Sequence, residues 1–552
     1  MRRFLVSLCL MFTVSVLLPV TGYAIQFNAV GSRANGMGAA GVALIDDENA
    51  GHWNPANLGL PSATRGYQED YATGLGVFSG AQIQSTRDFL KENQDLVDQF
   101  GQGDTLSNIV KNDFSDTTDY ANYLKLFREL GDLTRDGQGI LAHFNAGANI
   151  RHTNLSVSLS NQSDVAGFTN LNLSGILVGG LSADSDAARQ FTTGDSSVTA
   201  PSTEPTSQEF KDAAKQVSKD LDNAFETQKL SPQDLGFDSN TTSDSIANAI
   251  ASRAESDSDK VSAEDLTKAS EIVTPGIVSL GDTTDSDSDA SFDTENQRLV
   301  LQGTSINEMA FHYAKPDPLL NFLGSPLYLG STLRLMQGRV AYVENNPFES
   351  NASDSTGELF NQEDDVKKST DFGVDLGLTY DARETLGFKL AVVGKYLNSP
   401  SFEYPDSQEA NDTPVVAPDE VTVDPQVRVG FSGYPLDFMP VDIGSDWWQL
   451  SADYDITTNE TLMNDYEKKY VSVGNEFNLI NSFWLNIALR AGARENLAEA
   501  SEGRLYTGGV GVQLAGLNVD VSGVVSDKRV KDEEGNEQPT VAGGSFNLSY
   551  RF

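Results

Sequence analysis

The chain has 552 residues, and its 38 Lys and Arg against 79 Asp and Glu give a formal net charge of −41. This length is enough for one large barrel or for several ordinary domains. The acidic excess argues against nucleic acid and against anionic membranes as partners, because binding to phosphates depends on clustered Lys and Arg. Only one apolar run approaches the roughly 20 residues of a transmembrane helix, and it lies at the start, which excludes a polytopic helical membrane protein.

Residues 1–24 have the features of a secretory signal. Two arginines precede a mostly apolar stretch over residues 4–20, and the small residues Gly22 and Ala24 occupy the −3 and −1 positions of a cleavage site. We expect cleavage after Ala24. An uncleaved membrane anchor is the alternative, but no charged stop-transfer flank follows. Cys9, the only cysteine, lies in this segment, so the mature chain should contain no disulfide.

The second half of the sequence alternates apolar and polar residues with a period of two. Over residues 448–456, Trp, Leu, Ala, Tyr and Ile alternate with Gln, Ser and two Asp, and the pattern recurs at 372–380, 388–396 and 517–525. Each stretch has about the ten residues that a tilted strand needs to cross a bilayer. A secreted β-sandwich is the alternative. Aromatic residues near the strand ends favour the membrane, because they form girdles at its interfaces.

The last segment carries a terminal signal. Phe546, Leu548, Tyr550 and Phe552 face one way, and the polar residues between them face the other. This resembles the signal by which outer-membrane barrel proteins are recognised by their assembly machinery. We therefore predict an all-β fold, a transmembrane outer-membrane β-barrel of a Gram-negative bacterium, with membrane lipid and the assembly machinery as partners. A closed barrel satisfies all of its backbone hydrogen bonds in lipid.

We predict about 14 antiparallel strands, an even number as expected for bacterial barrels. The predicted strands are 66–80, 140–151, 153–162, 298–313, 326–344, 370–381, 386–398, 422–433, 447–457, 468–477, 481–494, 504–514, 516–526 and 541–552. If the C-terminus is periplasmic, the tight connections 151–154, 382–385, 478–482 and 515–518 fall inside, and long polar ones fall outside. The apolar stretch 168–180 would upset this parity unless it forms a hairpin within its loop.

Two insertions in the barrel region, residues 63–552, are expected to lie outside the cell. Residues 84–136 have helical spacing of apolar side chains. The acidic insertion, residues 163–297, carries 24 acidic and 8 basic residues between positions 181 and 297 and should be largely solvated. Within it, the capping box Thr-Ser-Gln-Glu at 206–209 predicts the start of an amphipathic helix.

Gly36, Gly38 and Gly41 form a G-x-G-x-x-G pattern near the expected mature N-terminus. A dinucleotide-binding site would need a strand before the pattern, a helix after it and an acidic residue about 20 positions later. The next acidic residues, Asp46 and Asp47, come too soon. We interpret the glycines as allowing the backbone to bend tightly in a confined space.

The same region resembles a known family. Residues 31–38 (Gly-Ser-Arg-Ala-Asn-Gly-Met-Gly), 40–43 (Ala-Gly-Val-Ala) and 53–58 (Trp-Asn-Pro-Ala-Asn-Leu) look like the N-terminal hatch of the FadL-type long-chain fatty acid transporters. They look at least as much like the related outer-membrane proteins labelled conjugal-transfer TraF-like. The resemblance implies a 14-stranded barrel plugged by residues 25–62.

The resemblance also implies a function. It suggests passive uptake of a hydrophobic small molecule, which passes through the lumen and is released when the hatch shifts. Gly36, Gly38, Gly41 and the element Asn54, Pro55 and Ala56 would then belong to the hatch and ligand pathway, although Asn-Pro-Ala is also compatible with an ordinary turn. The alternative is a non-transport structural or assembly component of the envelope, TraF-like and associated with conjugation.

Metal and catalytic sites are not expected, and neither is a cofactor. The acidic run 285–296 begins like a calcium loop, but Ala290 replaces the turn glycine and Asn296 the bidentate Glu. The four histidines are scattered, and no serine nucleophile motif accompanies them. An outer-membrane hydrolase built from residues at the barrel rim is the remaining enzymatic alternative.

Overall fold

The computed structural model describes residues 27, 29–61, 73–87, 89, 137–170, 204–228, 242–256, 262–264, 266–267, 298–345, 366–405, 420–438, 447–463, 465–482, 484–531 and 537–551. The expected signal segment, most of the predicted helical insertion, the acidic run 285–296 and Phe552 lie outside these residues. No helix within the described part of the chain is both long and apolar enough to cross a membrane.

Fourteen antiparallel strands form one closed barrel. They are β1 (Thr73–Thr86), β2 (Gly139–His152), β3 (Leu155–Asn170), β4 (Arg298–Ala314), β6 (Ser325–Asn345), β7 (Val366–Ala382), β8 (Phe388–Lys395), β11 (Gln426–Gly433), β12 (Trp448–Asp455), β15 (Tyr470–Asn481), β16 (Leu485–Asn496), β17 (Arg504–Leu514), β18 (Leu517–Ser526) and β21 (Val541–Arg551). Each pairs with its neighbours along the chain, β1 pairs with β21, and β4 pairs directly with β6. The prediction of a 14-stranded antiparallel barrel is confirmed.

Short strands and helical turns lie in the connections between the barrel strands. They are β5 (Leu320–Phe322), β9 (Ser401–Glu403), β10 (Glu420–Thr422), β13 (Asn459–Glu460), β14 (Glu467–Lys468), β19 (Arg529–Lys531), β20 (Glu537–Pro539), α13 (Arg383–Leu386), η5 (Pro435–Phe438) and η7 (Ala500–Glu502). Only β5 joins the main sheet, as a hairpin with β6, whereas the other short strands pair outside it.

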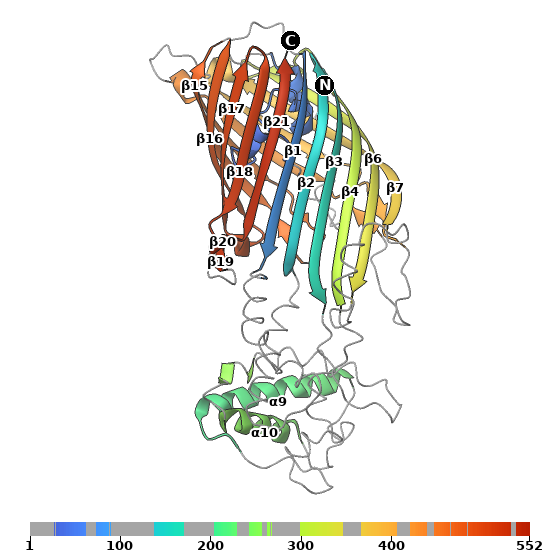
Figure 1. The fold of residues 1–552 in the computed structure, drawn as a ribbon, viewed down its shortest axis with the longest axis vertical. Helices are drawn as coiled ribbons and strands as arrows, with labels where there is room; N and C mark the ends of the chain where they lie inside the picture. Colours follow the sequence, from blue (N-terminus) through green and yellow to red (C-terminus); the bar gives the residue numbers. More distant parts are fainter. Residues whose placement is uncertain are drawn as a thin grey trace.

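The two ends of the barrel differ in their connections. One end, which we call the hatch end, carries the four tight connections predicted above, now bounded by the strands as 153–154, 383–387, 482–484 and 515–516. The other end, the loop end, carries the long connections, including 171–297 and 396–425. Figure 1 shows β21 ending at the hatch end, and the helices α9 (Gln208–Gln228) and α10 (Ser243–Ser256) beyond the loop end.

The barrel wall inverts the usual distribution of polarity. In β12, Tyr454 is 39% exposed on the outside, whereas the inward Asp453 and Asp455 are almost fully buried. In β21, Phe546 and Tyr550 point outward, and the polar residues between them point inward. Apolar side chains outside and polar side chains inside are the arrangement of a barrel that spans a lipid bilayer.

Two predicted strands needed correction in their bounds. The strand expected at 66–80 is β1, which begins at Thr73 and continues to Thr86. The strand expected at 153–162 is β3, which runs to Asn170 because its pairing with β4 continues that far. Residues 168–170 therefore end a barrel strand, and the acidic insertion leaves the barrel after Asn170; the rest of the stretch 168–180 lies outside the described residues.

The amphipathic helix predicted from the 206–209 box is α9, but its cap differs from the expected one. The hydroxyl of Ser207 accepts the Phe210 N–H at 3.4 Å, so Ser207 is the capping residue. Glu255 of α10 accepts the backbone N–H groups of Thr206 and Ser207, where a reciprocal box would use a Glu of α9 itself. Apolar residues of the two helices pack along a shared seam.

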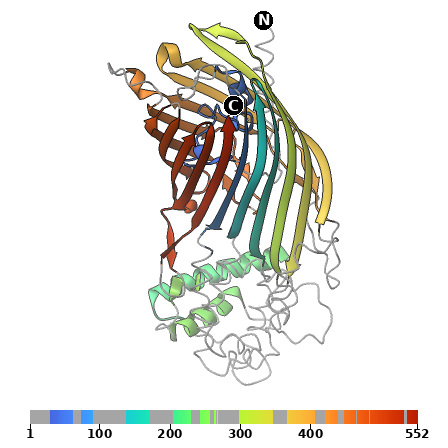
Figure 2. The same ribbon diagram turned by 45° about the horizontal axis from the view of Figure 1, so that its top comes forward.

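Residues 27 and 29–61, which we call the hatch, lie inside the barrel. They contain α2 (Ser32–Asn35), α3 (Ala50–Trp53) and η1 (Pro55–Gly59). Figure 2 shows this segment in blue within the ring of strands. Trp53 and Phe27 pack with their ring centroids 5.6 Å apart in a small apolar core of the hatch, which rests on Ala391 and Val393 of β8. The hatch therefore contributes no strand to the barrel and is held by its side-chain and backbone contacts.

Candidate functional site

A chain of buried charges holds the hatch on one side. Arg33 of α2 makes a bidentate contact with Glu476 of β15, with both N–O distances 3.0 Å, and also donates to Gln449. Glu476 accepts from Arg490 at 2.6 Å, and Arg490 donates to Asp520 at 2.6 Å. Burial alone would lower the pKa of Arg33, but the Glu476 carboxylate and its neighbours raise this pKa well above its ordinary value. The hatch arginine thus completes a charge network of the wall.

A second set of charged contacts holds the middle of the hatch. The Asp46 carboxylate lies 3.6 Å from the ammonium of Lys389, and Glu48 lies 3.1 Å from the guanidinium of Arg551. Burial alone would raise the pKa of Asp46, but the surrounding cations, Lys389 foremost, lower it below its ordinary value. Arg151 of β2 donates to three backbone carbonyls of the hatch. Cationic side chains of the wall therefore clamp an acidic turn of the hatch.

The three predicted glycines lie where the hatch touches the wall or itself. Gly38 has a φ of 72°, and a Cβ there would lie 2.6 Å from a carbonyl oxygen of β16. Gly36 rests against β17, and Gly41 faces the indole of Trp53 while its N–H donates to Asp453 at 2.7 Å. The wall has a matching glycine, Gly492, whose Cβ would collide with the Gly38 backbone. These glycines let two backbones approach closely, as interpreted from the sequence.

Asn54, Pro55 and Ala56 meet the opposite part of the wall. The Asn54 side chain accepts the Ala56 N–H at 3.0 Å, which caps η1, and donates to the hydroxyl of Thr379 in β7 at 3.1 Å. Pro55 occupies the first position of η1, where its missing N–H costs nothing. Gly377 of β7 makes room for the Asn54 amide. The glycines and the Asn-Pro-Ala element thus belong to one segment, the hatch, but contact different strands. Gly36 and Gly38 rest on β15–β17, and Asn54 to Ala56 rest on β6 and β7.

A pair of histidines at the hatch–wall boundary was not singled out from the sequence. Both ring nitrogens of His52 are buried without a partner, and its ring centroid lies 6.2 Å from that of His312. Burial, reinforced by Arg334 and other cations of the wall, lowers the pKa of His52 well below its ordinary value. His312 bonds to Ser158 and Thr332, both at 2.9 Å. Nothing in the spacing of two histidines 260 positions apart predicts this contact.

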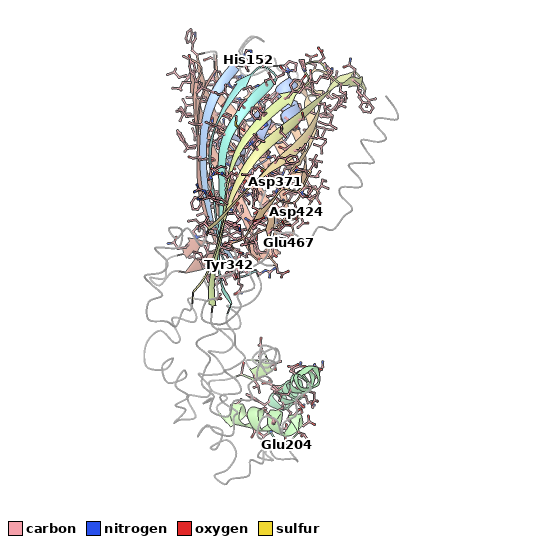
Figure 3. All side chains as sticks on the ribbon, turned by 90° about the vertical axis from the view of Figure 1, so that its right-hand side faces the viewer. His152, Glu204, Tyr342, Asp371, Asp424 and Glu467 are labelled. Atoms are coloured by element: carbon pink, nitrogen blue, oxygen red, sulfur yellow. The ribbon has the colours of Figure 1, made fainter. Side chains whose placement is uncertain are left out.

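An apolar cluster, which we call the loop plug, fills the loop end of the barrel. Its buried members are Leu141, Ala166, Ile306, Met336, Val340, Tyr396, Phe402, Tyr404, Val421, Val423, Leu462, Met463 and Tyr466. Figure 3 labels Tyr342, which packs against this cluster, far from His152 at the hatch end. The Tyr466 hydroxyl contacts Gln84 of β1 and donates to Glu502 at 3.3 Å. Loop residues thereby pack on inward residues of β2, β3, β4 and β6 at the end opposite the hatch.

A polar chamber of about 60 Å³ lies in the lumen beside the hatch. Its lining includes Phe27, Asn35, Gln82, His143, Asn145, Arg428, Tyr470, Ser472, Arg494, Thr507, Ser522 and Ser545, with small residues of β1, β18 and β21 completing the wall. No Asp or Glu is among the residues that line it. The sequence analysis did not identify these residues as a site, because they come from eight strands and the first part of the hatch.

The described residues show no metal-binding group of three or more His, Cys, Asp or Glu side chains. All four histidines are described, and none links a hydroxyl to a carboxylate as the base of a catalytic triad does. His143 bonds to Asp164 at 2.8 Å and to an amide, and His312 bonds to two hydroxyls. His152 bonds to the hydroxyl of Thr73 at 2.9 Å.

The outward side chains of the proposed assembly signal follow the predicted register. Phe546 and Tyr550 are exposed on the outer face of β21, Leu548 shares that face, and Arg551 turns inward to Glu48 of the hatch. Phe552 lies outside the described residues, so its position in the signal stays a prediction.

Solved barrels of similar size resemble this chain. The P. putida toluene transporter TodX shares 11% identity, with 97% of this chain and 99% of TodX covered and a TM-score of 0.35. A TodX mutant described as a monoaromatic hydrocarbon channel, deltaS2S3, shares 9% identity with a TM-score of 0.39, covering 94% of this chain and 98% of the other. A Pseudomonas aeruginosa FadL homologue shares 9% identity with a TM-score of 0.32, covering 96% and 99%. At these values the likeness says nothing about what the present chain binds.

Sequence comparison gives a more specific assignment. No curated protein sequence matches the chain. The sequence model of one family, described as "F plasmid transfer operon, TraF, protein", matches residues 52–455, from the second half of the hatch to the end of β12. Since this match spans most of the chain, the protein belongs to the TraF family of that description.

Proposed function

We propose that this protein is a channel in the outer membrane of a Gram-negative bacterium for passive uptake of a hydrophobic small molecule, with the hatch as its gate. The observation that supports the proposal best is that the hatch lies in the lumen beside a chamber and yet contributes no strand to the barrel. The hatch can move without breaking a strand pair, so the membrane-spanning wall stays closed while the lumen opens.

The loop plug offers the first binding surface. Its tyrosines, phenylalanine, methionines and aliphatic side chains form an apolar cluster at the loop end of the lumen. Ligand sites in proteins are mostly apolar with a few well-placed polar groups. A hydrophobic molecule would be captured there, pass into the chamber when Tyr466 leaves Gln84 and Glu502, and leave when the hatch shifts.

The second candidate is a non-transport structural or assembly component of the envelope. The family description, which names a plasmid transfer operon, favours it. The helices α9 and α10, which project beyond the loop end, would then provide the contact with other envelope components.

Uptake of fluorescent hydrophobic probes separates the two candidates. Cells with the wild-type protein are compared with a strain that lacks it, and Pro55→Ala is the test variant. Pro55 restricts its own φ and the backbone of Asn54, so the substitution should alter the uptake rate while the heat-modifiable band of the barrel stays unchanged. Wild-type uptake equal to that of the deletion strain, for several probes, would remove the channel proposal and leave the structural one.

The location is tested separately. We expect the protein in the outer-membrane fraction, with a mature N-terminus at Ile25 by mass spectrometry. Recovery as a soluble periplasmic protein, or retention of residues 1–24, would contradict the proposed export route.

A further inference from the structure

We propose that the chamber is a binding site for a small anion, such as a carboxylate or phosphate group. This does not rest on uptake of a hydrophobic molecule, since the site is defined by its own charges and volume. The whole protein has a net charge of −41, yet no carboxylate lines the chamber and two guanidinium groups do. A random section of so acidic a chain would place acidic side chains there.

Arg494 of β16 is the central residue of the site. Its guanidinium donates to Gln82 at 2.5 Å and lies 4.9 Å from the ring of Tyr470, and it makes no ion pair with any described residue. Its Nε is buried without a hydrogen-bond partner. The guanidinium is partly buried, and its buried Nε–H has no acceptor. An unused buried donor is unfavourable until an acceptor arrives, and an anion is the strongest acceptor for it.

Two basic side chains pack on Phe27, a residue that lines the chamber. The ammonium of Lys395, on a side chain only 3% exposed, contacts the ring of Phe27 at 3.9 Å and has no ion-pair partner among the described residues. Arg428 contacts the same ring at 3.9 Å, but its charge is balanced by Asp455. Phe27 and Arg428 line the chamber, whereas Lys395 contacts the same ring without being part of the lining.

The carboxylates nearest the chamber are already engaged by other groups. Asp164 bonds to His143 at 2.8 Å, and Glu502 accepts from Tyr470 at 2.7 Å and from Asn496. They lie behind the residues that line the chamber and leave Arg494 unpaired. Ser472, Ser522, Ser545 and Thr507 bring hydroxyl groups to the lining; Thr507 donates to Gly36, Ser545 donates to Ser32, and Ser522 bonds to Ser545.

The volume limits the size of the anion. A buried water needs about 10–15 Å³ of such space, and a cavity that holds benzene measures roughly 150 Å³. The chamber has about 60 Å³. This volume therefore fits phosphate, acetate or the carboxylate end of a larger molecule, and it is too small to enclose an aromatic ring.

Binding of sodium phosphate and sodium acetate to the purified full-length protein tests the site, by titration calorimetry at constant ionic strength set with sodium chloride. We expect saturable binding of at least one of them by the wild type, weakened at least tenfold in Arg494→Gln and retained in Arg494→Lys. Arg504→Gln is the matched control, because Arg504 is exposed and paired with Glu495 away from the chamber, and it should bind as the wild type does.

A second variant covers the case in which Arg494→Gln does not fold. Asn145→Asp is nearly isosteric and places a carboxylate in the lining, so it should abolish binding of either anion. Heat modifiability on gels establishes folding of each variant. Absence of saturable binding by the wild type, or equal binding by the wild type and by whichever of the two chamber variants folds, would overturn the proposal.

Discussion

Replacing Arg33 with Gln should release the hatch from the barrel wall. Arg33 is 5% exposed and holds Glu476 through two contacts of 3.0 Å. Removing one partner of a buried ion pair costs about 3–5 kcal/mol, because the other charge is left uncompensated. Here Arg490 remains on Glu476 and Lys389 remains on Asp46, so we expect the lower end of that range.

A single cysteine in the hatch can measure this loss. Ser32 is fully buried beside Arg33, and Ser32→Cys is nearly isosteric. The sequence has no other cysteine except Cys9 in the expected signal, so a maleimide reagent would report on one position. When closing is faster than labelling, the labelling rate is proportional to the population of released hatch. A loss of about 3 kcal/mol corresponds to roughly a hundredfold faster labelling.

A control variant and the heat-modifiable band of the barrel show whether the effect of Arg33→Gln is specific to the hatch. Arg504→Gln removes an exposed ion pair and should leave the labelling rate unchanged. The heat-modifiable band should persist in both variants, since the hatch adds no strand. An unchanged labelling rate in Arg33→Gln would show that the charge network does not hold the hatch, and loss of the band would show that it supports the barrel instead.

Three further predictions use the same cysteine reporter or the assembly assay. Gly492→Ala should speed labelling of the Ser32→Cys reporter, because the new Cβ would collide with the hatch backbone. Gly523→Ala is the control, because its Cβ would meet no atom closer than 3.7 Å, and it should leave the rate unchanged. Equal rates in the two variants would contradict close contact between the hatch and β16. Burial lowers the pKa of His52 in the docked hatch, so protonation of this side chain favours the released hatch. Docking should therefore be fully stable above the ordinary histidine pKa of about 6.5, and its free energy should fall by up to about 1.4 kcal/mol for each pH unit below that value. His52 of the released hatch is already half protonated at pH 6.5, so after correction for thiol ionisation we expect about fivefold faster labelling at pH 5.5 than at 6.5, and His52→Asn should reduce the dependence. Phe552→Asp should impair membrane assembly more than Arg551→Gln, which should instead loosen the hatch through Glu48; equal insertion with equal labelling would count against the register of β21.

The sequence by itself determined the barrel. A strand buried against lipid on one face and polar on the other must alternate with a period of two, and about ten residues are needed to cross. Both properties are local, so the segments at 448–456 and 541–552 could be read as strands with the correct face outward. The ends of β1 and β3 were less predictable, because a strand continues as long as its neighbour offers partners, and Asn170 pairs with Arg298 across the whole acidic insertion.

Only the tertiary structure decided the lumen. Most inward residues of the strands are polar, and the alternation does not distinguish a side chain that holds the hatch from one that lines the chamber. Arg490 is neutralised by Glu476 and Asp520, whereas Arg494, on the same face of the same strand, has no carboxylate partner. That difference depends on which side chains the neighbouring strands and the hatch bring within a few ångströms, and these come from positions hundreds of residues apart. Charge pairing across a closed barrel is a long-range property, so it appears only when the ring is closed.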